Sequence, residues 1–227
     1  MLPLGSLRTA ASTEAFVARS ASATSHERSQ SSGEVGRTRP LFVEKVRRAC
    51  PDKRIEVWFQ DEARIGHPRG QGTLTRVWGE RGKRPRAVRQ TEYQWGYVFG
   101  AANPMTGESS ALIAPTVSTS LMSVHLRMIA EAAGDEAHVV LVLDGAGWHR
   151  SKALRVPASM TLLFLPPYAP ELMPIERVWL WMRQHDLSNR VFKDAKAIDV
   201  ACRESWNKLT PERFQSITAT AWMTHEG

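Results

Sequence analysis

The sequence predicts a mixed α/β fold in which helices flank a central β-sheet. Strand-like patterns come first along the chain, and an amphipathic helix, two more strands and a group of helices follow them. The run HVVLVL at residues 138–143 is almost continuously apolar, which is typical of a strand that is buried on both faces. These two observations favour a sheet with helices on its faces over an all-helical or all-strand protein.

The first part of the predicted fold contains a short helix and three strands. Apolar residues recur at helical spacing in LFVEKVRRAC, residues 41–50. The three strands are RIEVWFQDEARI at residues 54–65, YQWGYVFGAANP at 93–104 and GESSALIAPTV at 107–117. We interpret PMTG, residues 104–107, as the hairpin turn between the second and third strands.

The second part alternates strands with helices. Ser and Thr precede an apolar helical period in residues 118–134, and Gly134 ends it. The strand at residues 138–144 follows, and Pro166 and Pro167 stop a further strand that begins at Met160. The remaining segments have helical patterns and lie at residues 174–187, 193–209 and 211–222.

Length and composition indicate one sizeable domain with a different N-terminal segment. Ser, Thr, Ala and Gly make up 21 of the first 40 residues of the 227-residue chain, so we expect a disordered Ser/Ala/Arg-rich tail at 1–40 and a folded domain at 41–227. The net charge of +7 favours a nucleic-acid partner, although many proteins are mildly basic without one. The two cysteines form no metal-type pair, and no apolar run is long enough for a membrane span. We therefore expect a cytoplasmic protein.

Three acidic residues occupy similar positions in this pattern. Asp61 lies near the end of the first strand, Asp144 directly follows the apolar strand, and Glu176 lies at the start of a helix. Acids at the ends of adjacent strands can converge with one from a nearby helix. Because clustered carboxylates repel one another, a hard cation such as Mg²⁺ between them is the economical explanation. Two such ions support phosphoryl transfer.

Each acid also has a purely structural interpretation. Asp61 could pair with Arg64, and Asp144 could be a turn residue that tolerates unusual backbone angles. Glu176 could serve the helix dipole, because an acid is favourable in the first turn of a helix. Only the combination of the three favours a metal site.

Five motifs in this order resemble one protein family. They are FQDEARIG, then Trp78, Gly82 and Pro85, then YVFGAANPMTG, LVLDGAGWH and LPPYAPELMPIERVW. Together they resemble the DDE transposases of the bacterial insertion sequence 630 family, which belong to the mariner transposase superfamily. The resemblance extends over roughly residues 54–215.

The resemblance implies an RNase H-like fold and a triad of metal-binding catalytic residues. By motif these are Asp61, Asp144 and Glu176, which would bind Mg²⁺ or Mn²⁺ as two ions. The implied activity is cut-and-paste DNA transposition, in which DNA phosphodiester hydrolysis at the element ends is followed by strand transfer. The implied partners are the transposon ends, the target DNA and a second copy of the chain in a homodimer, in the bacterial cytoplasm near the nucleoid.

Two features depart from the family pattern. Met173 stands where the superfamily usually has Asn before the proline of PIE. We expect residue 173 to be the N-cap of the following helix, so that Met173→Asn would stabilise the protein. In addition, residues 1–40 do not resemble the helix-turn-helix region that family members carry. Three explanations stay open: a frameshifted element whose upstream reading frame encodes that region as a separate polypeptide, a mispredicted start, and a decayed copy.

A basic segment is the predicted DNA contact. Residues 76–89 contain one acid, Glu80, and six basic residues: Arg76, Arg81, Lys83, Arg84, Arg86 and Arg89. We interpret these residues and His149 as DNA-binding. The alternatives are a solvated hairpin for the segment and a helix-start residue without chemistry for His149.

Three functions remain open on the sequence alone. The first is a metal-dependent transposase catalytic domain. The second is an RNase H-like nuclease of another kind, which would share the triad but not perform strand transfer. The third is an inactive or truncated remnant that only binds DNA or partner chains.

Overall fold

The structure is a computed structural model that describes residues 41–66, 80–81, 95–165 and 172–219. After a helical segment at residues 41–49, its first elements are β1 (Arg54–Gly66), β2 (Trp95–Ala102), β3 (Ser109–Ala114) and α2 (Thr119–Ala133). Then come β4 (Ala137–Leu143), β5 (Met160–Phe164), α3 (Ile175–Met182), the π-helical η2 (Arg183–Leu187), α4 (Ala195–Asn207) and α5 (Pro211–Thr218). The predicted tail at residues 1–40, including the expected lack of a helix-turn-helix there, lies outside the described residues.

The strands form one mixed sheet in the order β3-β2-β1-β4-β5. β1 is the central strand, which pairs antiparallel with β2 and parallel with β4. The pair β2–β3 is antiparallel and the pair β4–β5 is parallel. Every residue of β4 is buried, which confirms that this apolar run is an interior strand.

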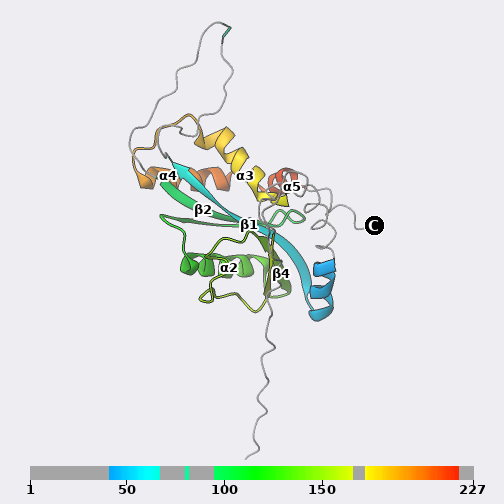
Figure 1. Ribbon diagram of the computed structural model, residues 1–227. Coiled ribbons are helices and arrows are strands. Elements are labelled where there is room, and N and C mark those ends of the chain that lie inside the picture. The colour runs from blue at the N-terminus through cyan, green and yellow to red at the C-terminus, as the bar shows by residue number, and fades with distance from the viewer. Residues whose placement is uncertain (1–40, 67–79, 82–94, 166–171, 220–227) are drawn as a thin grey trace, which may run out of the picture.

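Helices cover both faces of the sheet, as Figure 1 shows: α2 lies on one face, and α3, α4 and α5 lie on the other. Each face has its own apolar core. Trp58 of β1 belongs to the core beneath α2, whereas its neighbour Phe59 belongs to the core beneath α3 and α4. Because successive side chains of a strand point to opposite faces, Asp61 is on the α3 face and Glu62 is on the α2 face.

The helix ends follow the predicted signals. The side chain of Ser118 accepts a hydrogen bond from the amide of Leu121 at the start of α2, and Gly134 ends this helix with φ of 80°. Asp194 caps α4 and Thr210 caps α5 in the same way as Ser118. Among the described residues, no helix is long and apolar enough to cross a membrane.

The expectation for Met173 is wrong. α3 begins at Ile175, its N-cap is Pro174, and no side chain caps it. Met173 is only 7% exposed and packs in the core beneath α3 and α4, with Phe59 among its members. An asparagine at this position would place an amide in an apolar core instead of capping a helix.

We predict that Met173→Asn destabilises the protein by about 2–4 kcal/mol, because apolar contacts are lost and a polar group is buried. The free energy of unfolding in urea measures this effect. Met105→Asn is the matched control, since Met105 is 58% exposed and its loss should change stability little. A higher stability of Met173→Asn would restore the capping interpretation.

Candidate active site

The parallel pairing of β1 with β4 brings Asp61 and Asp144 to corresponding positions just beyond the end of that pairing, although β1 itself continues to Gly66 rather than ending near Asp61 as the sequence suggested. Phe59 lies opposite Val142 in the register. Asp61 follows Phe59 by two residues, and Asp144 follows Val142 by two residues. Neighbouring strands are about 4.8 Å apart, so the two acids leave the backbone at adjacent points. Asp144 is the first residue beyond β4, and its side chain is 55% exposed.

Asp61 is a half-buried carboxylate that a tryptophan side chain from α3 contacts. The indole Nε1 of Trp179, on α3, donates to its Oδ2 at 2.9 Å. Burial raises the pKa of Asp61 to about 7, against the opposing effect of the Trp179 hydrogen bond and with a further increase from the negative charge of Glu176. Asp61 and Glu176 therefore lie close enough to repel each other.

Gly100 makes the Asp61–Trp179 contact possible. This glycine lies directly opposite Asp61 on β2. A Cβ atom at Gly100 would overlap the ring of Trp179. Trp179 is 1% exposed, as expected of a core residue, but its N–H group also reaches the acid.

Asp144 is bound to a buried histidine. Its Oδ1 accepts a hydrogen bond from the amide of Ala146 at 2.9 Å and lies 2.8 Å from Nδ1 of His149. The other ring nitrogen, Nε2, lies 2.9 Å from Oε1 of Glu62. The side chain of His149 is 0% exposed and that of Glu62 is 7% exposed.

The charges of this group are coupled. Burial by itself would lower the pKa of His149, but the hydrogen bonds to Asp144 and Glu62 outweigh burial and raise it to about 9. The hydrogen bond from His149 in turn lowers the pKa of Asp144. Because carboxylates only accept, a protonated imidazole that donates from both nitrogens fits this geometry.

More than half of the chain matches the model of a known family. Residues 56–199 match the model described as DDE superfamily endonuclease. The chain belongs to this family. An uncharacterized protein, y4pE/y4sA of Sinorhizobium fredii (strain NBRC 101917 / NGR234), is 46% identical over 130 residues, which are 56% of this chain and 96% of that protein.

Solved structures of the Mos1 transposase resemble the DDE domain in fold. The paired-end complex with the left transposon end has a TM-score of 0.58 and 15% identity, and the strand transfer complex has 0.54 and 13%. A paired-end complex with Mn has 0.57 and 14%. The matches cover 91% of this chain but only 62–63% of the Mos1 chain. They confirm the RNase H-like fold predicted from the motifs.

The structure brings two of the predicted acids into electrostatic contact and places the third beside them. Asp61 and Glu176 interact, and Asp144 lies at the end of the adjacent strand. In the described ranges, however, no three His, Cys, Asp or Glu side chains are arranged so that they could hold a metal ion. The three carboxylates of the DDE domain thus lie near the end of the β1–β4 pairing and on α3 without being gathered around a single point.

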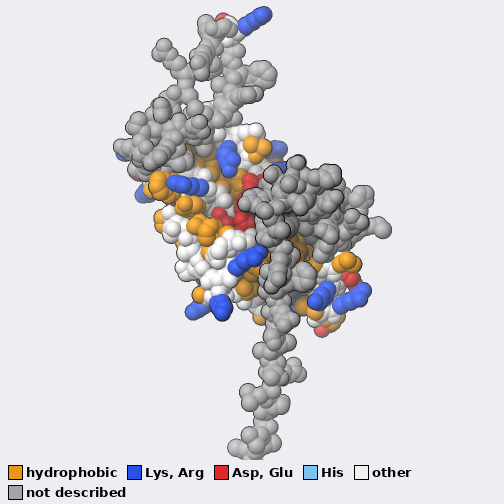
Figure 2. All heavy atoms as spheres, in the orientation of Figure 1, with side chains coloured by type: hydrophobic (Ala, Val, Ile, Leu, Met, Phe, Trp, Pro, Cys, Tyr) orange, Lys and Arg blue, Asp and Glu red, His pale blue; other side chains and the backbone are white. Residues whose placement is uncertain are grey.

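The oxygen chemistry of these residues nevertheless suits a hard cation. All three offer carboxylate oxygens, the ligands that Mg²⁺ prefers. The raised pKa of Asp61 shows that its negative charge is poorly compensated by the protein groups around it. A divalent cation would provide this compensation. Figure 2 shows acidic side chains gathered near the centre of one face, with Lys and Arg side chains around them.

The structure agrees with two of the three purely structural interpretations of the acids, those of Asp144 and Glu176. Arg64 does not pair with Asp61, because the two side chains point to opposite faces of β1. The guanidinium of Arg64 lies 4.2 Å from the ring centroid of Trp95 instead. The turn interpretation of Asp144 agrees with its hydrogen bond from the amide of Ala146. Glu176 does lie in the first turn of α3. A turn or helix-end role is compatible with metal binding, since neither uses both oxygens of the carboxylate.

The predicted DNA contact at His149 does not fit its surroundings. The imidazole has no exposed surface and both its nitrogens have protein partners. A contact with DNA would require it to leave two carboxylates. Of the predicted basic contacts, Arg81 is exposed, and the others lie outside the described residues: Arg76, Lys83, Arg84, Arg86 and Arg89.

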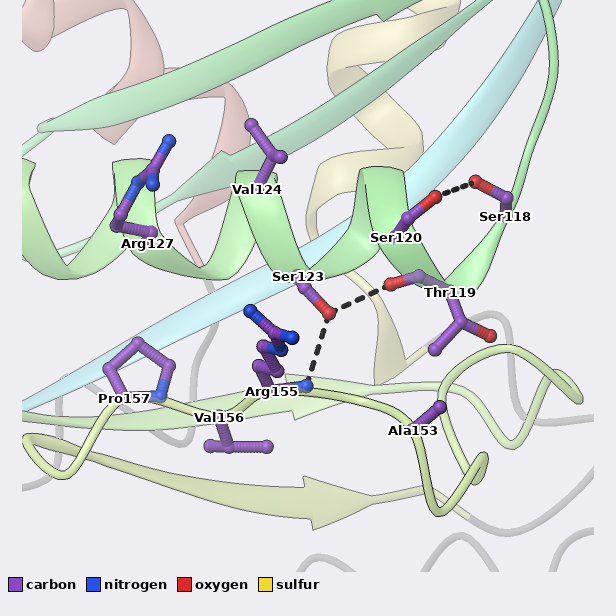
Figure 3. Close-up of a pocket in the computed structure, with 10 residues that line it drawn as sticks. All are labelled: Ser118, Thr119, Ser120, Ser123, Val124, Arg127, Ala153, Arg155, Val156 and Pro157. Atoms are coloured by element: carbon purple, nitrogen blue, oxygen red, sulfur yellow. Dashed lines mark hydrogen bonds between the residues drawn. The ribbon is translucent and has the colours of Figure 1, made fainter.

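A groove of the DDE domain lies away from the three acids. It has a volume of about 920 Å³ and lies between the first half of α2 and residues 153–157 (Figure 3). Ser123 connects the two walls, since it donates to the carbonyl of Thr119 and accepts from the amide of Arg155. None of the three acids lines this groove.

Sequence reasoning missed Glu62, the role of Trp179 as a donor, and the need for glycine at position 100. Glu62 gave no distinct signal, because its face of β1 also carries the polar residues Glu56 and Gln60. Gly100 carried a weak signal, since glycine is unfavourable inside a strand and often marks a close approach. Nothing local connects Trp179 to Asp61, 118 residues away.

We predict that stability, measured in urea with a chelator present, falls as pH rises from about 6.5 to 9. The folded protein keeps the His149 proton that the unfolded chain releases, because the pKa is raised from 6.5 to about 9. One pKa unit corresponds to about 1.4 kcal/mol, so the loss is on the order of 3 kcal/mol. His149→Gln should remove this slope, and His185→Gln, at an exposed site, should keep it.

Asp61 contributes in a separate pH window. Its folded-state pKa is raised from 3.8 to about 7, so stability is lost as pH rises through that range, and Asp61→Asn should abolish this loss. A pH profile that Asp61→Asn and His149→Gln both leave unchanged would contradict the proposed environments of the two groups.

Proposed function

We propose that this chain is the catalytic domain of a DNA transposase that hydrolyses phosphodiester bonds at element ends and transfers the freed strand to target DNA. The observation that carries the proposal is the position of Asp61 and Asp144 two residues beyond the last pair of the parallel strands β1 and β4, with the charge of Glu176 acting on Asp61. Membership of the DDE superfamily endonuclease family and the fold of Mos1 transposase support it.

Asp61, Asp144 and Glu176 are the proposed ligands of two Mg²⁺ or Mn²⁺ ions. The Mos1 complexes with Mn and with Mg support the use of these metals. When bound, such ions activate a nucleophile and stabilise the leaving oxygen of a phosphodiester. The protein's part is to aim the ligands: Trp179 holds one oxygen of Asp61, and the amide of Ala146 holds one oxygen of Asp144.

The proton of Asp61 competes with the cation in this scheme. Because the pKa of Asp61 is raised to about 7, a substantial share of this carboxyl group is protonated at neutral pH when no cation is bound. Cation binding at this residue therefore strengthens as pH rises through about 7. Cleavage should have the same pH dependence where metal binding limits the rate.

The DNA contacts belong to basic side chains rather than to His149. The proposed contacts are Arg76, Arg81, Lys83, Arg84, Arg86 and Arg89. Such contacts go to phosphates, so affinity should fall as salt rises. This chain spans about 62% of the Mos1 chain. A homodimer and a helix-turn-helix polypeptide that recognises the element ends are accordingly further parts of the proposal.

The test is cleavage of DNA that carries the ends of the element encoding this chain, with Mg²⁺ or Mn²⁺ present. We predict that Asp144→Asn lowers cleavage at least about a hundredfold, the order lost when one electrostatic stabiliser of a transition state is removed. The control is Asp199→Asn, since Asp199 lies on α4 and pairs with Arg203. Denaturing gels would separate cleaved from joined strands.

The products distinguish the candidate functions. Joined strands support transposition. Cleavage without joining identifies an RNase H-like nuclease of another kind. DNA binding that needs no metal and leads to no cleavage identifies a non-catalytic remnant and overturns the proposal.

A further inference from the structure

A chain of hydrogen bonds leads from the buried core to Asp144. It begins at Glu62, whose Oε1 accepts from Nε2 of Gln60 at 3.0 Å, from Nε1 of Trp148 at 3.2 Å and from His149 at 2.9 Å. Gln60 is fully buried, and Trp148 packs against the core beneath α2. Three donors from separate side chains therefore hold one oxygen of Glu62 in place.

The chain of hydrogen bonds continues through His149 to the exposed acid. Nδ1 of His149 lies 2.8 Å from Oδ1 of Asp144, which also accepts from the amide of Ala146. The backbone amide of His149 donates to the carbonyl of Ala146, so a turn at residues 146–149 holds the segment after β4 together. The other oxygen of Asp144, Oδ2, takes part in neither contact.

His149 has little freedom to move. Its ring is fully buried, and rotation would leave the largely buried Glu62 without one of its donors. An unpaired buried polar group costs about 1–3 kcal/mol, and more when the group is charged. The imidazole therefore links the fixed carboxylate of Glu62 to that of Asp144, which would otherwise be held only by the amide of Ala146.

We propose that Glu62 and His149 are positioning residues that hold the carboxylate of Asp144 in one orientation and leave its Oδ2 to a divalent cation. This inference rests on the proposed function, because it assumes that Asp144 is a metal ligand. Neither positioning residue serves as a ligand itself. The side chain of Glu62 is 7% exposed, against 55% for Asp144, and its Oε1 already has three donors. Both nitrogens of His149 are engaged.

The alternation of side chains along β1 separates metal binding, the proposed role of Asp61, from the positioning of Asp144 by Glu62. Asp61 and Glu62 are neighbours in sequence, but Asp61 contacts Trp179 on the α3 face and Glu62 contacts His149 on the α2 face. One strand thus supplies a proposed ligand on one face and a support for another ligand on the opposite face. Groups that orient metal ligands in this way typically contribute 10–100-fold to metal affinity.

The experiment measures Mn²⁺ binding to the full chain without DNA, by counting the free ion from its electron paramagnetic resonance signal. Glu62→Ala should raise the Kd for Mn²⁺ about 10–100-fold. Glu62→Gln should retain most of the affinity, because its amide can still bond to Nε2 of His149. Glu131→Ala, at an exposed position of α2, should bind Mn²⁺ like the unsubstituted chain.

A double variant separates positioning from a general loss of structure. If Glu62 acts through Asp144, adding Glu62→Ala to Asp144→Asn should not weaken the remaining Mn²⁺ binding further. Circular dichroism checks that each variant is folded. If Glu62→Ala does not fold, His149→Asn replaces it, since it also breaks the link to Glu62 and should raise the Kd by a similar factor.

Two results would overturn the inference while leaving the proposed function intact. One is Mn²⁺ affinity in the folded Glu62→Ala variant, or in its His149→Asn replacement, equal to that of the unsubstituted chain. The other is additive losses in the double variant. If the unsubstituted chain binds no Mn²⁺, the metal-dependent function fails and the positioning role fails with it.

Discussion

The site depends on one constraint, the parallel pairing of β1 with β4 in a fixed register. Phe59 opposite Val142 sets Asp61 beside Asp144, two residues further along. A shift of one residue would turn every side chain of β1 to the other face of the sheet. Asp61 would then enter the α2 core and Glu62 would meet Trp179. The apolar side chains of both strands resist such a shift, because Trp58 and Phe59 each fill a different core.

This constraint explains why two adjacent acids have different environments. Asp61 has a raised pKa, caused first by burial, and one indole donor. The side chain of Glu62 is also largely buried, but three donors satisfy it. A well-paired buried carboxylate holds other groups in place, whereas a poorly compensated one favours a cation. The two faces of one strand thus separate structural support from the proposed chemistry.

Predictions from the sequence succeeded where the signal is local. The strands and helices were placed within a few residues, because side-chain period, caps and prolines act over short distances. The errors concern burial. Met173 was expected to be a helix cap, but the chain enters α3 one residue later and the side chain lies in the core. His149 was expected at the DNA surface, but the loop after β4 folds it inward against Glu62.

The sequence by itself determined the order of the elements and the fold class and indicated three candidate acids, because periodicity and motif spacing are local features of the chain. Only the tertiary structure decided which partner each acid has. Trp179 reaches Asp61 across 118 residues, and His149 reaches Glu62 across 87. Such contacts follow from strand register and helix packing, which bring distant residues together without any local pattern in either segment. Asp144 was therefore identifiable as a candidate ligand from its position after a buried strand, whereas the buried histidine and glutamate that hold it became visible only in the folded chain.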